Sequence, residues 1–117
     1  MPLTVNSRVE NEIAILDLEG SLTLGPSLHN LRNAARQVLA SSKLSGIVMR
    51  TSGVTKTDSA GLGELTVVYS LAVKRGCRVA LAGVNQNLRV MLEITHLDGL
   101  LPAAEDLAGA KKLIAAP

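Results

Sequence analysis

Aromatic residues are almost absent from this chain of 117 residues, which has no Trp, no Phe and a single Tyr, Tyr69. Modules that bind single-stranded nucleic acid stack bases on several aromatic side chains, so the composition argues against that class of partner. Because 47% of the residues are hydrophobic, the core must be built from aliphatic side chains. We therefore expect an aliphatic globular fold that does not bind nucleic acid directly.

Cysteine and long hydrophobic runs are also scarce. Cys77 is the only cysteine, which excludes an internal disulfide and a thiolate zinc cluster and fits a reducing compartment. No run approaches the roughly 18 apolar residues of a membrane-spanning helix, and the N-terminus lacks the pattern of a signal peptide. The sequence predicts a soluble cytoplasmic protein without membrane contact, metal or cofactor, in which Cys77 is a small buried hydrophobe.

Charge is low overall, with a net charge of +2, but it is unevenly distributed. Residues 1–20 hold one Arg and four acidic residues, whereas residues 21–89 hold nine Lys or Arg and only two acidic residues. An acidic protein partner would explain the basic middle of the chain. Solvated helix faces and cations at helix C-termini would explain it as well, and this second reading is the simpler one.

Hydrophobic periodicity predicts alternating strands and helices. Strands are expected at 3–9, 12–19, 46–50, 77–84 and 100–101, and helices at 26–40, 59–75, 85–95 and 103–115. The first two strands are joined through Glu10-Asn11 as a hairpin, and the polar segment 51–57 is interpreted as a loop.

This order predicts an α/β fold with parallel pairing through right-handed crossovers. We expect a single domain over residues 1–117. Its mixed sheet of four to five strands would have an antiparallel N-terminal edge strand, and about four helices would pack mainly on one face.

The segment after the central predicted strand carries the strongest functional signal, because sites in open α/β sheets gather where strands end and helices begin. Asp58 or Ser59 can cap the helix that starts there. Gly61 and Gly63 each cost a helix about 0.8–1 kcal/mol relative to Ala, which indicates a close approach of backbone to another group. That group could be a partner, or simply the sheet beneath the helix.

Ser59 would place a hydroxyl at the positive end of a helix dipole, where a phosphate is favoured. Phosphorylation would add a charge of about −1.5 to −2 to the surface with little effect on the fold. From the residues alone, a regulatory Ser59 and a purely structural helix start with Asp58 as N-cap both remain open.

The run Asp58-Ser59-Ala60-Gly61-Leu62-Gly63 resembles the Asp-Ser-Ser-Gly-Leu-Gly signature of STAS domains, specifically of the bacterial anti-sigma factor antagonists. The likeness covers nearly the whole chain and includes Ile13–Gly25, Gly46–Gly53 and Cys77–Gly83. This sequence differs from the family signature at Ala60, which replaces a second Ser, and at Thr57, which stands where an apolar residue is usual. The family's common Asp after the second strand is absent as well, since Leu22 and Thr23 occupy that region.

The resemblance implies a STAS-like fold and a role in transcription regulation by partner switching, without enzymatic activity. The unphosphorylated form would bind an anti-sigma serine kinase with a histidine-kinase-like ATPase fold and so release the sigma factor. Phosphorylation of Ser59 would break that complex, and a PP2C-type phosphatase would restore it. The implied partner-binding residues are Thr57, Asp58, Ser59, Ala60, Gly61, Leu62 and Gly63. Thr57 is a second nearby hydroxyl.

Two other interpretations deserve comparison. A serine hydrolase built on Ser59 with His29, His96 and Asp98 fits poorly, since a Gly-x-Ser-x-Gly elbow needs Gly where Thr57 stands. A STAS module that serves as a constitutive scaffold, or as a small-ligand or lipid-transport accessory, is the serious alternative. In that case Ser59 would never be phosphorylated.

Overall fold

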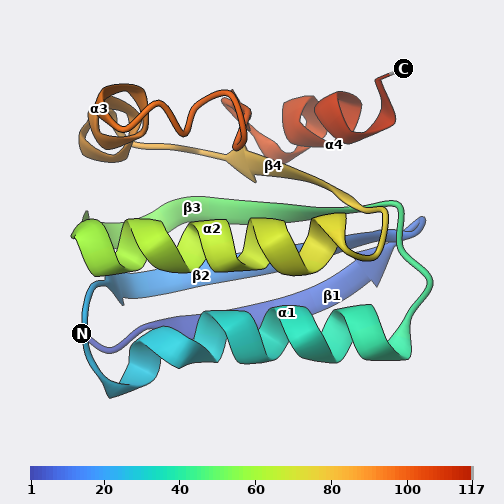
Figure 1. Ribbon diagram of the computed structural model, residues 1–117, viewed down its shortest axis with the longest axis horizontal. Coiled ribbons are helices and arrows are strands. Elements are labelled where there is room, and N and C mark those ends of the chain that lie inside the picture. The colour runs from blue at the N-terminus through green and yellow to red at the C-terminus, as the bar shows by residue number, and fades with distance from the viewer. Residues whose placement is uncertain (117) are drawn as a thin grey trace.

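The computed structural model describes residues 1–116, which form one five-stranded sheet and its helices (Figure 1). The strands are β1 (Thr4–Glu10), β2 (Ile13–Leu22), β3 (Gly46–Thr57), β4 (Arg78–Ala82) and β5 (Ala103–Ala104). The helices are a 3-10 turn, η1 (Pro26–His29), followed by α1 (Asn30–Ser41), α2 (Ser59–Val73), α3 (Gln86–Ile94) and α4 (Leu107–Ala115). None of the helices in these residues is long and apolar enough to cross a membrane.

The strands lie in the sheet in chain order, β1-β2-β3-β4-β5. β1 runs antiparallel to β2, and every later neighbour is parallel. This arrangement confirms the expected mixed sheet with an antiparallel N-terminal edge. Since parallel neighbours share a direction, the carboxyl ends of β2 and β3 lie at the same end of the sheet, where the α2 segment begins.

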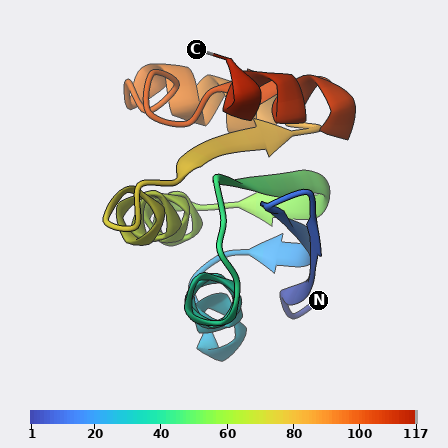
Figure 2. The ribbon, with the colours of Figure 1, turned by 90° about the vertical axis from the view of Figure 1, so that its right-hand side faces the viewer.

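The two faces of the sheet are covered differently (Figure 2). The larger hydrophobic cluster joins Leu16, Leu18 and Met49 to buried side chains of α1, α2 and α3, whereas α4 packs on the other face against Ile15 and Val48. Helices therefore pack mainly on one face, as the sequence predicts, and within residues 1–116 part of the opposite face carries no helix.

The segment 51–57 is not a loop, and that prediction was wrong. It continues β3, which pairs with β2 as far as Leu22↔Thr57 across two register shifts. The segment looks like a loop in sequence because only Thr51 and Val54 are buried within it, so its hydrophobic alternation is weak. The consequence is functional, because an extended strand and not a flexible loop carries the chain into Asp58.

The C-terminal prediction also needs correction. Leu100 and Leu101 lie in a turn, and the short edge strand is Ala103–Ala104, which pairs with Leu81 and Ala82 of β4. The last helix begins at Leu107 and not at residue 103, because the Asp106 side chain accepts a hydrogen bond from the Gly109 N–H and caps it. Two small Ala residues give almost no strand signal, which is why sequence patterns placed the strand on the leucine pair.

Other boundaries differ by a few residues. The hairpin turns at Asn11 and Glu12, which both have positive φ, and not at Glu10-Asn11. The first predicted helix, 26–40, opens as the 3-10 turn η1 before α1 begins at Asn30. The second predicted helix, 59–75, ends at Val73 and is followed by a turn with Gly76 at φ 73°.

Candidate functional site

The predicted site lies where β3 ends and α2 begins, beside the carboxyl end of β2. β3 ends at Thr57, Asp58 is the N-cap with extended backbone, and Ser59 is the first residue of α2. The backbone N–H of Asp58 donates to the carbonyl of Leu22 at the end of β2, which joins the two strand ends. The sheet therefore fixes the start of α2 from both strands.

The Asp58 carboxylate holds two segments together. Its Oδ1 accepts from the Gly61 N–H at 2.9 Å, and its Oδ2 accepts from the Leu24 N–H at 3.0 Å. The first bond caps α2, and the second ties the loop after β2 to the helix start. These bonds favour the charged carboxylate, so the pKa of Asp58 lies below its ordinary value, with the Leu24 bond as the largest cause. Asp58 is thus a structural residue of the site.

Asp58 should make stability depend on acid pH. Because the folded-state pKa is lowered, its contribution is present above the unfolded pKa, about 3.9, and is lost as the pH falls through the folded value. We expect Asp58→Ala to lower the free energy of unfolding by about 1–2 kcal/mol near pH 7 through loss of the cap. Urea titrations at pH 7 and pH 3 test this, and the deficit should shrink at the lower pH. An equal deficit at both would contradict this role.

Gly61 and Gly63 have different surroundings, so the packing constraint differs between the two positions. A Cβ on Gly61 would lie 1.8 Å from the carbonyl oxygen of Leu22, so α2 rests directly on the backbone of β2 at this point. A Cβ on Gly63 would meet nothing within 4 Å. Close packing of the helix on the sheet therefore explains Gly61. It does not explain Gly63, where the exposed surface of the helix has no side chain.

Ser59 and Thr57 present their hydroxyls differently. Ser59 is exposed. The Thr57 Oγ1 is buried and has no hydrogen-bond partner among residues 1–116. Only the first hydroxyl can reach the active site of another protein without local unfolding, so the structure removes the main reason to regard Thr57 as an alternative phosphoacceptor.

The buried Thr57 hydroxyl should also cost stability. A buried polar group without a partner loses its bonds to water and regains nothing. Thr57→Val keeps the shape of the side chain and removes the hydroxyl, so we expect it to raise the free energy of unfolding by about 1 kcal/mol. Chemical denaturation tests this directly. A destabilised Thr57→Val would show that the hydroxyl has a partner in solution.

The seven residues expected to bind a partner differ in exposure, and Thr57 and Asp58 are half-buried. Gly61 and Leu62 are buried and Ala60 is half-buried, so they shape the site from within. Ser59 and Gly63 are exposed. They lie four positions apart on α2, which places them on one face of the helix. The exposed part of the motif is therefore this pair.

Sequence reasoning missed an ion pair between α1 and α2 near the site. Glu64 is 3% exposed and accepts two hydrogen bonds from Arg32 of α1, from Nε at 2.7 Å and from Nη2 at 2.6 Å. The pair joins α1 to α2 one turn after Ser59 and raises the pKa of Arg32 through the Glu64 bonds. One signal was available, since Glu64 is a charged residue between the buried Leu62 and Leu65. Its partner could not be read from sequence.

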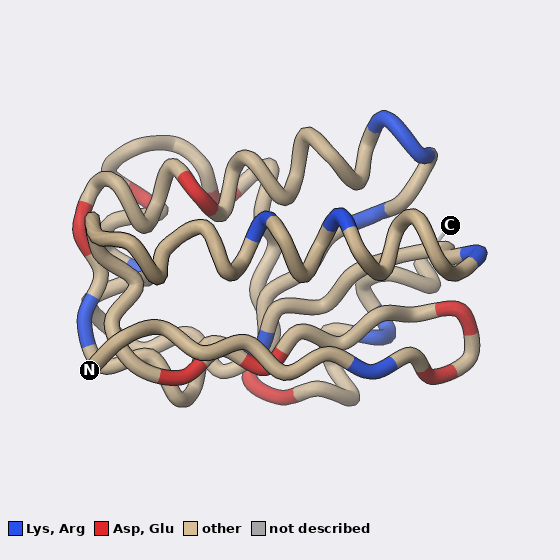
Figure 3. Tube along the Cα trace, turned by 90° about the horizontal axis from the view of Figure 1, so that it is seen from below, with Lys and Arg blue, Asp and Glu red and all other residues tan. Residues whose placement is uncertain are grey.

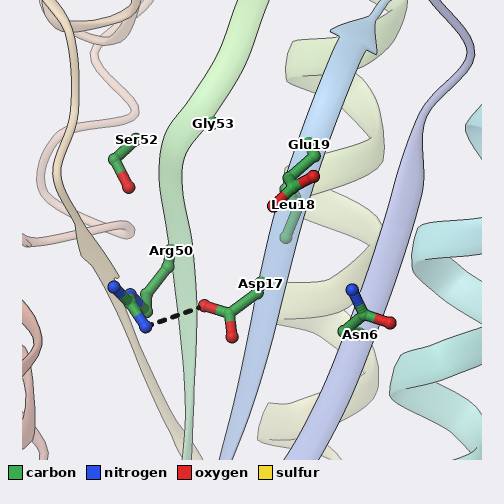
Figure 4. A pocket seen from close by; sticks show the side chains of 7 residues that line it. All are labelled: Asn6, Asp17, Leu18, Glu19, Arg50, Ser52 and Gly53. Carbon is green, nitrogen blue, oxygen red and sulfur yellow. Dashed lines mark ion pairs between the residues drawn. The ribbon is translucent and has the colours of Figure 1, made fainter.

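Arg50, one of the cations in the basic middle of the chain, does not lie beside Ser59. It points to the sheet face opposite α2, where its Nη1 lies 3.2 Å from Oδ1 of Asp17 (Figure 4). This pair lines a hollow of about 320 Å³ with Asn6, Glu19 and Ser52. Along β3, Arg50 precedes Thr57 by about 20 Å of extended chain. The hollow is therefore separate from the Ser59 site.

Several of the remaining cations gather at the other end of the helices. Lys74 and Arg75 follow the last turn of α2, and Arg75 Nη1 donates to the Leu39 carbonyl near the end of α1. Figure 3 shows basic residues along α1 and at the far end of α2, whereas Lys56, near the end of β3, lies two positions before Asp58. Cations at helix C-termini stabilise the helix dipole, so this placement supports the structural reading of the basic middle segment.

The single thiol behaves as the sequence predicts. Cys77 is 4% exposed, and its sulfur lies 3.3 Å from the Leu44 carbonyl oxygen. Burial raises the pKa of the thiol, which disfavours the reactive thiolate. The prediction of a small buried hydrophobe is confirmed.

Solved structures share this fold. An anti-sigma factor antagonist from Mycobacterium paratuberculosis is 20% identical over 97% of this chain and 94% of that one, with a TM-score of 0.80. A putative anti-sigma factor antagonist from Thermotoga maritima is 19% identical over 95% and 94%, with a TM-score of 0.77. The phosphorylated form of the Bacillus cell fate determinant SpoIIAA is 15% identical over 95% and 98%, with a TM-score of 0.67.

At these identities the structures show the fold alone. The family assignment rests on the sequence itself, since the family model described as "Mlab, STAS domain" matches residues 6–102. That range includes most of the hairpin, β3, the complete Asp58–Gly63 motif and β4. The chain belongs to the STAS domain family.

Proposed function

We propose that this STAS domain, as a single unit over residues 1–117, is an anti-sigma factor antagonist that acts by partner switching. In its unphosphorylated form it binds an anti-sigma serine kinase with a histidine-kinase-like ATPase fold, and this binding releases the sigma factor in the bacterial cytoplasm. The kinase then transfers the γ-phosphoryl group of ATP to Ser59, and the complex separates. A PP2C-type phosphatase hydrolyses the phosphoserine and restores the binding form.

The exposed hydroxyl of Ser59 on a rigid helix start is the observation that carries this proposal. Asp58 fixes the backbone of the first turn through Gly61 and Leu24, so the hydroxyl occupies a defined position. Thr57, the other hydroxyl next to the motif, is turned inward. A kinase that docks on this end of the domain would therefore meet one acceptor.

The surface around Ser59 supports a docking partner that approaches closely. At Gly63, one turn after Ser59, the backbone of α2 is exposed without a side chain. Leu24, whose N–H is held by Asp58, is 80% exposed and supplies an apolar contact without any aromatic residue. Backbone, an aliphatic side chain and a small hydroxyl would form a tight interface, in which there is little room for added charge.

A phosphate on Ser59 would weaken such a complex for two physical reasons. The dianion would lose its hydration in a closed interface, and it would lie next to the carboxylate of Asp58. The fold itself would tolerate the group, because anions are favoured at helix N-termini. The proposed switch therefore acts on the surface and leaves the domain folded.

Phosphorylation with a matched pair of variants tests the proposal. The protein is incubated with its anti-sigma kinase and ATP, and its mass is measured. We expect an increase of about 80 Da, the mass of one phosphoryl group, in wild type and in Thr57→Val and none in Ser59→Ala. If wild type gains no mass, or Ser59→Ala gains it, the switch fails. A kinase complex that forms without phosphoryl transfer would favour the constitutive scaffold.

A further inference from the structure

The two edges of the sheet differ in how well they are protected. β5 has two residues and follows Pro102, so it offers little backbone to another strand. β1 has seven residues, Thr4–Glu10, without Pro, Gly or Lys. Its register with β2 is regular from Thr4↔Glu19 to Glu10↔Ile13, with no bulge to twist it away. An edge strand of this kind is a template for a further strand.

The one cation on β1 does not protect the edge. Arg8 Nε donates to Glu10 at 2.8 Å, and its Nη1 donates to Asp17 of β2 at 2.7 Å. Glu10 is also bound by Lys111 of α4 at 2.6 Å. These contacts pull the Arg8 side chain over its own sheet and neutralise its charge. The repulsion that commonly keeps two edge strands apart is therefore weak here.

The outer side of β1 has no partner among residues 1–116. Its backbone hydrogen bonds join it to β2. The hydrogen bonds from the η1–α1 segment reach only Leu3, whose N–H donates to Ser27 and whose carbonyl accepts from Asn30. Alternate N–H and C=O groups of Thr4–Glu10 thus face outward and are available to another chain.

The side chains of β1 are self-complementary when two copies run antiparallel about Ser7. Val5, Ser7 and Val9 are paired with Leu18, Leu16 and Ala14 of β2, so they lie on the face that carries α1. A two-fold axis at Ser7 pairs all seven residues and sets Val5 of each copy opposite Val9 of the other. Val9 is 43% exposed, a large apolar side chain that such pairing would cover.

We infer that β1 is a homodimerisation edge, on which a second copy of this chain adds its own β1 antiparallel about Ser7 to form one continuous sheet. In strand order β2 separates this edge from β3, whose carboxyl end leads into Asp58 and Ser59. The dimer would leave both Ser59 sites accessible. The inference does not depend on phosphorylation, so the two proposals can fail separately.

Disulfide trapping tests both the edge and its register. In the proposed dimer the two Cα atoms of residue 7 lie about 5 Å apart, within the range of a disulfide, whereas those of residue 6 lie roughly 8 Å apart, beyond it. We expect Ser7→Cys to form a covalent dimer under mild oxidation and Asn6→Cys to form at least tenfold less. In urea the two variants should cross-link equally. Wild type controls for Cys77, which is buried.

Sedimentation equilibrium with a matched pair of lysine variants provides the second test. We expect a reversible monomer–dimer equilibrium in wild type. Val9→Lys should raise the dissociation constant at least tenfold, because it places a charge on the paired edge. Val90→Lys on α3, where Val90 is similarly exposed at 38%, should leave it unchanged. A wild type that stays monomeric at all concentrations, or Ser7→Cys that cross-links no better than Asn6→Cys, would overturn the inference.

Discussion

Replacement of Ser59 by Asp should weaken binding to the anti-sigma kinase by about a hundredfold or more. An unpaired charge buried in a closed interface costs about 3–5 kcal/mol, and a hundredfold change in affinity corresponds to about 2.7 kcal/mol. Asp58 already places one carboxylate beside this position. Titration calorimetry of purified kinase with each form of the protein measures the effect.

The variant is informative because it should not disturb the fold. Ser59 is exposed, and an acidic residue in the first turn of a helix is favoured by the helix dipole. We expect the free energy of unfolding of Ser59→Asp to equal or slightly exceed that of wild type. Ser59→Asn is the matched control, since it has nearly the same size and no charge, and it should bind far better than Ser59→Asp. Equal affinities for wild type and Ser59→Asp would argue for the constitutive scaffold.

The second large effect should come from a single methyl group on Gly61. Its Cβ would lie 1.8 Å from the Leu22 carbonyl oxygen, which is backbone and cannot rotate away. The helix start would have to lift from β2, and this would strain the Asp58 bonds to Gly61 and Leu24. We expect Gly61→Ala to lower the free energy of unfolding by about 3 kcal/mol, at the upper end of typical overpacking costs.

Gly63→Ala is the control for this experiment. It adds the same methyl group two positions along α2, where nothing lies within 4 Å, so it should raise stability by about 0.5–1 kcal/mol through helix propensity. Denaturant unfolding of both variants measures the difference. In the kinase-binding assay Gly63→Ala is the more informative variant, because a folded Gly63→Ala domain that binds weakly would show that the partner contacts the helix backbone at Gly63. Similar stability for both variants would contradict the packing argument.

The order of elements was predictable from sequence because the core is aliphatic and strongly periodic. The helical stripe that includes Leu62, Leu65 and Val68 is buried as expected. Prediction failed where that signal fades. The second half of β3 is polar because much of it is exposed, and β5 consists of two Ala residues whose strand character comes only from pairing with β4.

The site, like the fold, was predictable from sequence only in part. The motif itself was visible in sequence, since two glycines at a helix start demand a reason. The reason for Gly61 is a carbonyl of β2, and the second bond of Asp58 goes to Leu24, far away in the chain. The Arg32–Glu64 pair likewise needs α1 to lie beside α2. Such contacts depend on the register between elements, which local patterns do not specify.

By itself the sequence determined the fold class, the STAS family and the position of the candidate switch residue, because hydrophobic periodicity and a short motif are local properties of the chain. The tertiary structure alone decided which hydroxyl faces solvent, which glycine supports the fold and where the basic residues gather. It also showed that the β1 edge is unprotected. These features arise from packing between segments that are distant in sequence, and the same residues in another register would have other neighbours.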